Sequence, residues 1–253
     1  AKGPAEIAAL LAATGFGRSI LTVLEALGGE HEAVSQHTAL GFGYPKFNEL
    51  NLCGIEVVAD AGARVLTLAS GLDDALFEHD GQITKREIRA MTLSALAPRK
   101  GELLWDIGGG SGSVSIEWML CDPAMRAIAI EEDAERAARI GRNAGNFGVP
   151  GLHVVTGAAP KALADLPVPD AIFVGGGGSE EGVLAAAIAA LRPGGRLVAN
   201  GVTLEMEAVL LDHHARLGGA LIRVDVARAS PVGTMTGWRP AMPVTQWCWT
   251  KQG

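Results

Sequence analysis

A glycine-rich turn between an apolar strand and a helix constrains the fold of this chain more than any other feature. The turn is GGGSG, residues 108–112, within LLWDIGGGSGSVSIEW, residues 103–118. Glycine has no Cβ, so the backbone can come close to a ligand at the carboxyl end of the strand, where open α/β sheets bind their ligands. The segment therefore predicts either a nucleotide-type ligand site or a tight structural turn.

Apolar runs and Ala-rich helical stretches alternate from residue 103 onward. Strands that are apolar along their whole length are typical of sheets covered by helices on both faces. The pattern predicts an α/β fold with a doubly wound, mostly parallel sheet. Its strands are expected at 103–107, 126–131, 152–156, 170–175 and 196–202, with helices in the gaps.

The C-terminal stretch breaks this alternation. ALIRVDVARA (220–229) and MPVTQWCWT (242–250) both read as strands, and the loop between them has no room for a helix. Two such strands are expected to pair antiparallel as a C-terminal hairpin.

The first 70 residues have a different character. No complete nucleotide loop occurs in them, and their strands would leave unpaired edges unless another part of a sheet completes them. The expected elements are helices over 4–13 and 18–27, and strands in NLCGIEVVA (51–59) and ARVLTLA (63–69).

Composition and charge exclude several classes of protein. Hydrophobic residues make up 48% and charged residues 19%, which excludes an extended disordered chain. The net charge of −7 argues against a nucleic-acid binder. No apolar run reaches the roughly 20 residues of a membrane span, so no membrane partner is expected. Three widely spaced cysteines favour a cytoplasmic location. His213 and His214 have no further ligand at metal-binding spacing, so no metal is expected.

An acidic residue follows the glycine turn at the sequence spacing expected of a ribose-binding carboxylate. RAIAIE ends at Glu131, about 20 residues after the turn, where a carboxylate can accept hydrogen bonds from both ribose hydroxyls of a nucleotide. Glu132 and Asp133 have a simpler explanation, because acidic residues are common in the first turn of a helix. Glu131 is the favoured ribose contact.

The form of the turn favours one class of nucleotide-type ligand. D-x-G-x-G-x-G, from Asp106 to Gly112, resembles the first motif of class I S-adenosylmethionine-dependent methyltransferases, and LRPGGRLV (191–198) resembles the turn before their fifth strand. The resemblance implies that S-adenosylmethionine is the cofactor. It also implies a sheet of the class I methyltransferase type, which ends with an antiparallel strand.

A longer segment is more specific. Residues 80–118, together with 156–163, 169–178, 194–205 and 233–244, resemble the decarboxylating C15-methyltransferases of cobalamin biosynthesis. The resemblance implies methylation of a tetrapyrrole (precorrin) substrate at C15 with loss of carbon dioxide from the C12 acetate. Two alternatives stay open: a class I methyltransferase for another small acidic substrate, and a cofactor-binding module without turnover.

The front of the chain resembles a different family. PAEIAALLAATGFGRSILTVLEALGGEHE, residues 4–32, is similar to the second half of the C5-methylating tetrapyrrole methylases. In the fused precorrin C5,15-methyltransferases that domain precedes the C15 domain. The resemblance implies that 1–70 is the C-terminal remnant of a C5-methylase domain and 71–253 the C15 domain. It also implies an upstream C5-methylase domain in the full-length protein, and a homo-oligomer.

The resemblance assigns cofactor contacts where motifs align. Thr84 has a rival role, since it could be the N-cap of a helix expected over 83–96. The motif that usually reads GDAP is GAAP here, residues 157–160, so an adenine contact there must come from the backbone. The expected contacts are Thr84, Gly108, Gly109, Gly110, Ser111, Gly112, Glu131 and Ala159.

A substrate with many carboxylates requires cations near the cleft. Lys85, Arg86 and Arg89 begin the helix before the glycine turn and are the predicted substrate contacts; a solvated basic helix end is the alternative. Arg228 and Arg239 are weaker candidates. Glu117 fits a packing or capping role better than that of a proton carrier, and no catalytic residue is assigned. Gly175–Gly178 could give a macrocycle close access to the backbone or form a flexible turn.

Overall fold

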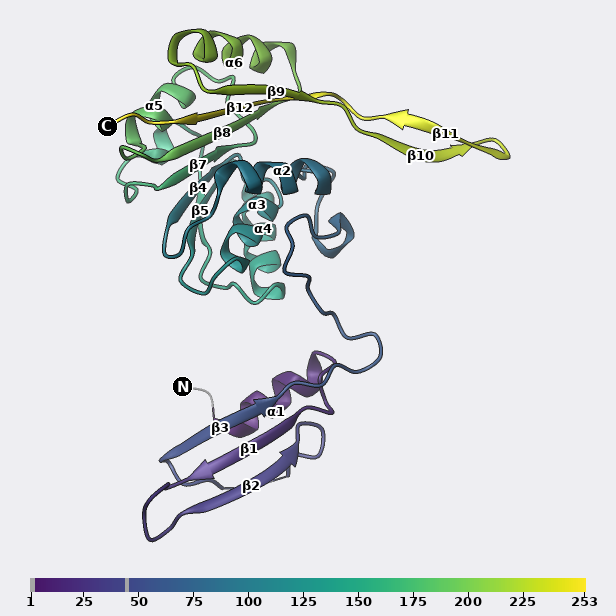
Figure 1. The fold of residues 1–253 in the computed structure, drawn as a ribbon, viewed down its shortest axis with the longest axis vertical. Helices are drawn as coiled ribbons and strands as arrows, with labels where there is room; N and C mark the ends of the chain where they lie inside the picture. The colour runs from purple at the N-terminus through teal and green to yellow at the C-terminus, as the bar shows by residue number, and fades with distance from the viewer. Residues whose placement is uncertain (1–2, 44–45) are drawn as a thin grey trace. The chain divides into compact units, whose positions relative to one another are not determined.

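The computed structural model describes residues 3–43 and 46–253. The chain divides into two compact units, Ala1–Leu66 and Thr67–Gly253, which are described separately (Figure 1).

Over residues 3–43 and 46–66, the smaller unit contains one helix and a three-stranded antiparallel sheet with the order β2-β1-β3. The helix α1 (Pro4–Ala13) confirms the prediction for 4–13. The buried core of this unit is small and centres on Ala8, Leu21 and Ala39. The strands are β1 (Ile20–Glu25), β2 (Ala33–Thr38) and β3 (Asn51–Glu56).

Two predictions for this unit are wrong. Residues 18–27 form β1 and not a helix, because β-branched Ile20, Thr22 and Val23 favour a strand and burial alternates with a period of two. ARVLTLA (63–69) forms no strand. Val65 and Leu68 in it are exposed, so the segment has no buried face to specify a register. The strand in NLCGIEVVA is confirmed as β3.

Within the described residues, the larger unit is built on a seven-stranded sheet with the order β6-β5-β4-β7-β8-β12-β9. The strand β12 (Val244–Thr250) runs antiparallel to both of its neighbours, β8 and β9 (Ala220–Val224). The predicted doubly wound sheet and its C-terminal antiparallel pair are confirmed. The bounds predicted for the five parallel strands agree within one residue, whereas the two C-terminal strands are shorter than predicted. The parallel strands are β4 (Leu103–Ile107), β5 (Arg126–Glu131), β6 (His153–Thr156), β7 (Ala171–Val174) and β8 (Arg196–Gly201).

Helices cover both faces of this sheet (Figure 1). Side chains alternate along β4, so that Trp105 faces one layer and Asp106 the other. One layer holds α2 (Arg86–Leu96), α3 (Ser113–Leu120) and α4 (Ala134–Asn146). The other holds α5 (Val183–Ala190), α6 (Leu204–Leu217) and the short 3-10 turn η2 (Lys161–Leu163), while a second 3-10 turn, η1 (Asp74–Leu76), precedes α2.

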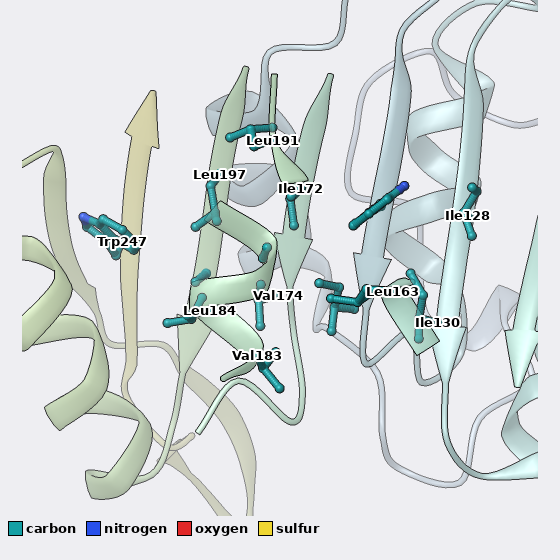
Figure 2. Close-up of a cluster of buried hydrophobic side chains, with 14 of the residues drawn as sticks. Ile128, Ile130, Leu163, Ile172, Val174, Val183, Leu184, Leu191, Leu197 and Trp247 are labelled. Atoms are coloured by element: carbon teal, nitrogen blue, oxygen red, sulfur yellow. The ribbon is translucent and has the colours of Figure 1, made fainter. Parts of the chain in front are cut away.

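A large core cluster lies between the sheet and the α5–α6 layer (Figure 2). Ile172 and Val174 on β7 and Leu197 on β8 are buried against Val183 and Leu184, which open α5. Truncating one such side chain to Ala would cost about 2–5 kcal/mol, since a packed core relaxes only partly around a cavity. This layer fixes the strands whose carboxyl ends form the site.

The C-terminal region contains a hairpin where a loop was predicted. The ALIRVDVARA run divides into β9 and β10 (Ala227–Val232), and β10 pairs antiparallel with β11 (Met235–Pro240). The two strands project beyond the seven-stranded sheet as a separate ribbon (Figure 1).

The helix predicted over 83–96 begins later than expected. It is α2, Arg86–Leu96, and the residue at its N-cap is Lys85, which makes no side-chain capping bond. The N-cap role for Thr84 is therefore wrong. Among the described residues, no helix has the length and apolar character required to cross a bilayer.

Candidate active site

A cleft of about 710 Å³ opens at the carboxyl ends of the parallel strands. The crossover helices change face between β4 and β7, and ligands of open α/β sheets bind at such a reversal. The loop after β4 meets the loop after β7 at this point. The lining includes Gly108–Gly110, Glu131, Gly157–Ala159, Gly175–Gly178 and residues of β8, β9, β10 and β12.

The glycine loop has a backbone that only glycine accommodates. Gly108 has φ of +73°, and a Cβ there would lie 2.6 Å from backbone atoms of Gly176. Gly112 has φ of +74°, and a Cβ there would lie 2.7 Å from the Ile140 side chain. The loops after β4 and β7 therefore touch through their backbones, with no room for a side chain at Gly108.

Glu131, at the end of β5, ties this loop to the next strand. Its side chain is 5% exposed and lines the cleft. Oε2 accepts a hydrogen bond from the Gly110 N–H at 2.8 Å, and Oε1 accepts one from the Asp133 N–H at 3.1 Å. Each carboxylate oxygen has two lone pairs, so the group keeps acceptor capacity for a ligand. Asp133 itself caps α4, as its first-turn position suggested.

Asp106 lies behind the glycine loop in a dry environment. Its Oδ2 accepts from the Ser115 hydroxyl at 2.7 Å and the Ser115 N–H at 3.2 Å, while Oδ1 has no hydrogen-bond partner among the described residues. Burial is the main reason that the pKa of Asp106 rises to about 7, and the nearby Glu131 charge adds to it. The first acidic residue of the motif thus supports the loop from outside the cleft lining.

The eight predicted cofactor contacts fall into two groups. Six of them line the cleft, namely Thr84, Gly108, Gly109, Gly110, Glu131 and Ala159. Ser111 and Gly112 lie outside the lining, the Ser111 side chain being buried and Gly112 packed on Ile140. Those two residues shape the loop and the start of α3.

The three predicted substrate cations separate in the structure. Lys85 lines the cleft, and its Nζ lies 3.9 Å from Asp74 Oδ2. Arg86 is exposed and outside the lining. Arg89 is fully buried and paired with Glu117 at 2.6 Å, so its prediction as a substrate contact is wrong. The i, i+4 spacing of Lys85 and Arg89 places them on one face but does not determine how deep each lies.

Two other predictions about charged residues are resolved by the same packing. Glu117 accepts the N–H groups of Gly71 and Leu72 as well as the Arg89 guanidinium, which confirms its packing role. Arg228, on β10, lines the cleft and is ion-paired with Glu87 of α2, whereas Arg239 lies outside the lining.

One wall of the cleft was not predicted from the sequence. This wall comes from β8, α6 and the C-terminal strands, and it includes Asn200, Met206, Val224, Val226, Met242 and Val244. Asn200 is held by buried side chains, donating to Thr92 Oγ1 at 3.0 Å and accepting from Gln246 Nε2 at 2.9 Å. The position of Asn200 at the carboxyl end of a predicted strand was the available signal.

Metal ligands are not grouped in the part of the chain that the structure describes. No cluster of three or more His, Cys, Asp or Glu residues there could hold an ion. His213 Nδ1 donates to the Val209 carbonyl oxygen at 2.9 Å within α6.

The strand order, the antiparallel final pair and the glycine loop at the topological reversal define the fold of class I methyltransferases. The family described as precorrin methyltransferase domain matches residues 75–251. The chain belongs to this family.

Individual relatives agree. A precorrin-6Y C(5,15)-methyltransferase [decarboxylating] of Sinorhizobium sp is 72% identical over 249 residues, which cover 98% of this chain and 60% of the relative. A probable cobalt-precorrin-6B C(15)-methyltransferase (decarboxylating) of Pyrobaculum calidifontis is 37% identical over 180 residues, 69% of this chain and 92% of the relative.

Among solved structures, the C-terminal domain of precorrin-6Y C5,15-methyltransferase from Rhodobacter capsulatus is 51% identical, with a TM-score of 0.70. The match covers 74% of this chain and 100% of that domain. The chain spans about 60% of the length of the Sinorhizobium relative.

Proposed function

We propose that the chain transfers a methyl group from S-adenosylmethionine to C15 of a precorrin and releases carbon dioxide from the C12 acetate, a step in cobalamin biosynthesis. The observation that carries the proposal is one cleft lined by two unlike groups of residues. A glycine loop tied to Glu131 forms one group, and Lys85 and Arg228 lie in the same lining. The Pyrobaculum relative, whose name states C15 methylation and decarboxylation, supports this reaction.

The residues of the cleft fit S-adenosylmethionine, which supplies an activated methyl group when it is bound. Glu131 keeps lone pairs that can accept both ribose hydroxyls. Gly108–Gly110 leave room for the methionine portion because no Cβ projects from them. Thr84 and Ala159 line the same space, and at Ala159 only backbone groups are available to adenine.

Lys85 and Arg228 are the proposed contacts for substrate carboxylates. Each now pairs with a carboxylate of the chain, Lys85 with Asp74 and Arg228 with Glu87. Both pairs are partly exposed, so exchange for a substrate carboxylate is cheap. Apolar Val224, Val226 and Met242 lie in the same lining and suit the body of a macrocycle.

Placement is the main contribution that methyl transfer requires of the protein. Asn200 offers a fixed amide at the cleft wall, because Thr92 and Gln246 hold its side chain. In decarboxylation the bond between the acetate CH2 carbon and its carboxylate breaks and carbon dioxide leaves. The electron pair of that bond enters the conjugated imines of the macrocycle, and a proton added to the CH2 carbon then gives a methyl group. The cleft residues orient the acetate for that step.

A methyl-transfer screen tests the proposal. The protein is incubated with methyl-labelled S-adenosylmethionine and either a precorrin that retains its C12 acetate or other small acidic molecules. Label in the precorrin supports the proposal, and label only in another acid favours a different class I methyltransferase. Binding of the cofactor without transfer to any acceptor would favour a module without turnover.

We further propose that residues 1–70 are the C-terminal part of a C5-methylating domain, with the rest of that domain upstream in the full-length protein. The Sinorhizobium relative, named for both C5 and C15, matches 98% of this chain, and residues 1–66 form a unit with its own sheet and core.

A cytoplasmic location is proposed because all three cysteines are free thiols. A homo-oligomer is proposed because Met235 and Trp238 are exposed on the ribbon.

A further inference from the structure

Arg89 is buried at the centre of a polar cluster beside the cleft. Its Nε donates to Glu117 Oε1 at 2.6 Å and its Nη1 to Asp74 Oδ1 at 3.0 Å. The same guanidinium donates to the carbonyl oxygens of Leu72 and Thr84 and lies 4.9 Å from the Phe77 ring centroid. Such a set of partners satisfies a charge that would otherwise be costly to bury.

Most of these partners come from one segment, Gly71–Lys85, here called the approach segment. It also meets Glu117, which accepts the N–H of Gly71 at 2.6 Å and that of Leu72 at 2.9 Å. Arg89 and Glu117 belong to α2 and α3, two helices packed on the sheet. The Arg89–Glu117 pair therefore holds the irregular approach segment against the layer of α2 and α3.

The end of the approach segment forms a wall of the cleft. Gly81–Lys85 line it, and the Gln82 carbonyl would lie 3.2 Å from a Cβ placed on Gly110. Arg89 holds this wall directly through Thr84, whose carbonyl accepts from the guanidinium. Asp74 connects the same guanidinium to Lys85, the cation at the cleft.

We propose that Arg89, with Glu117 as its counter-ion, is a positioning residue that holds Gly81–Lys85 against the glycine loop in the conformation that binds cofactor. The inference rests on the proposed function for the identity of the ligand. Of the three basic residues predicted as substrate contacts, Arg89 then shapes the wall of the cofactor site, and Lys85 keeps its proposed role as a substrate contact.

A second buried pair in the same unit provides a matched control. Arg196, at the start of β8, is bonded to Glu102 and donates to the Leu96 carbonyl at 2.6 Å. It lies at the amino ends of the strands, away from the cleft lining. Arg→Lys at either position keeps the charge but removes the fork that reaches several acceptors at once.

The experiment compares Arg89→Lys and Arg196→Lys by two readouts. Titration calorimetry well below the melting temperature gives the Kd for S-adenosylmethionine, and hydrogen exchange gives the protection of residues 71–85. We expect Arg89→Lys to raise Kd about tenfold or more, as loss of a charged hydrogen bond near a site does, and to lower protection in the approach segment. Arg196→Lys should lower Tm similarly with Kd within about twofold of the wild type.

Equal changes of Kd in both variants, or a wild-type Kd in Arg89→Lys, would overturn the inference. If the wild type itself bound no S-adenosylmethionine, the proposed function would fail, and the exchange data alone would decide the positioning role. Should Arg89→Lys not fold, Asp74→Asn removes one partner and is expected to lower protection at 81–85. Unchanged protection there would count against the inference.

Discussion

The Glu131 carboxylate accepts a hydrogen bond from the Gly110 N–H at 2.8 Å, so the end of β5 directly holds the loop after β4. The same carboxylate lines the cleft, so the hydrogen bond to the loop and the proposed ribose contact depend on one side chain. A change at Glu131 removes both functions at once.

Glu131→Ala is expected to raise the Kd for S-adenosylmethionine by about 5- to 150-fold, equivalent to about 1–3 kcal/mol for a lost charged hydrogen bond. Titration calorimetry measures it. Glu132→Ala is the control, because Glu132 also lines the cleft but its side chain is exposed, just after the end of β5. Equal affinities in the wild type and Glu131→Ala would place the ribose elsewhere.

Gly108→Ala is expected to lose cofactor binding and to destabilise the protein more than Gly101→Ala. Both glycines have positive φ, +73° and +84°, so both substitutions strain the backbone by about 1 kcal/mol. Only the Cβ at 108 also meets backbone atoms, those of Gly176 at 2.6 Å, while that at 101 meets nothing within 4 Å. Thermal melts compare the two, and equal losses of Tm would contradict the close contact between the loops.

Asp106 predicts a pH dependence of stability. Its pKa rises to about 7 on folding, from about 3.9 in an unfolded chain. Between these values the folded state binds more protons than the unfolded state, so the group's contribution to the free energy of unfolding falls as pH rises through that window. Above about pH 7 the contribution is constant, and the loss is at most about 4 kcal/mol.

Asp106→Asn removes this titration, so the variant should gain stability relative to the wild type between pH 5 and pH 8. Denaturant unfolding at both values measures the difference. Other carboxylates titrate in both proteins and cancel in the comparison. A difference that stayed constant with pH would show that Asp106 has an ordinary pKa.

Lys85→Gln and Arg228→Gln are each expected to raise the KM for the tetrapyrrole with little change in the Kd for S-adenosylmethionine. Contacts made equally in the ground and transition states behave in this way. Arg86→Gln is the matched control, since Arg86 starts the same helix but lies outside the cleft lining. The wild-type KM should also rise with salt, because exposed pairs are screened. An effect at Arg86 equal to that at Lys85 would indicate a general field and not direct contacts.

The parts of the fold that the sequence predicted well are those that local pattern determines. The parallel strands are short and mostly apolar, Gly108–Gly112 directly follow β4, and Glu131 ends β5. These residues could be placed near one another because the carboxyl ends of neighbouring parallel strands share an edge.

The errors occur where tertiary packing decides. Lys85 and Arg89 look alike in sequence, yet one lines the cleft and the other is buried, because Glu117 and the approach segment cover Arg89. Residues 18–27 have an apolar pattern compatible with a helix, and pairing with β2 and β3 makes them a strand. Asn200 becomes notable only once Thr92 and Gln246, distant in sequence, are seen to hold it.

The central claim is that one cleft couples C15 methylation to loss of the C12 carboxylate. Mass spectrometry of the product formed from a precorrin with methyl-labelled S-adenosylmethionine tests this most directly. We expect a product with one labelled methyl group gained and one carboxyl group lost. A product with two labelled methyl groups, or one that gains methyl and keeps all its carboxyl groups, would contradict it.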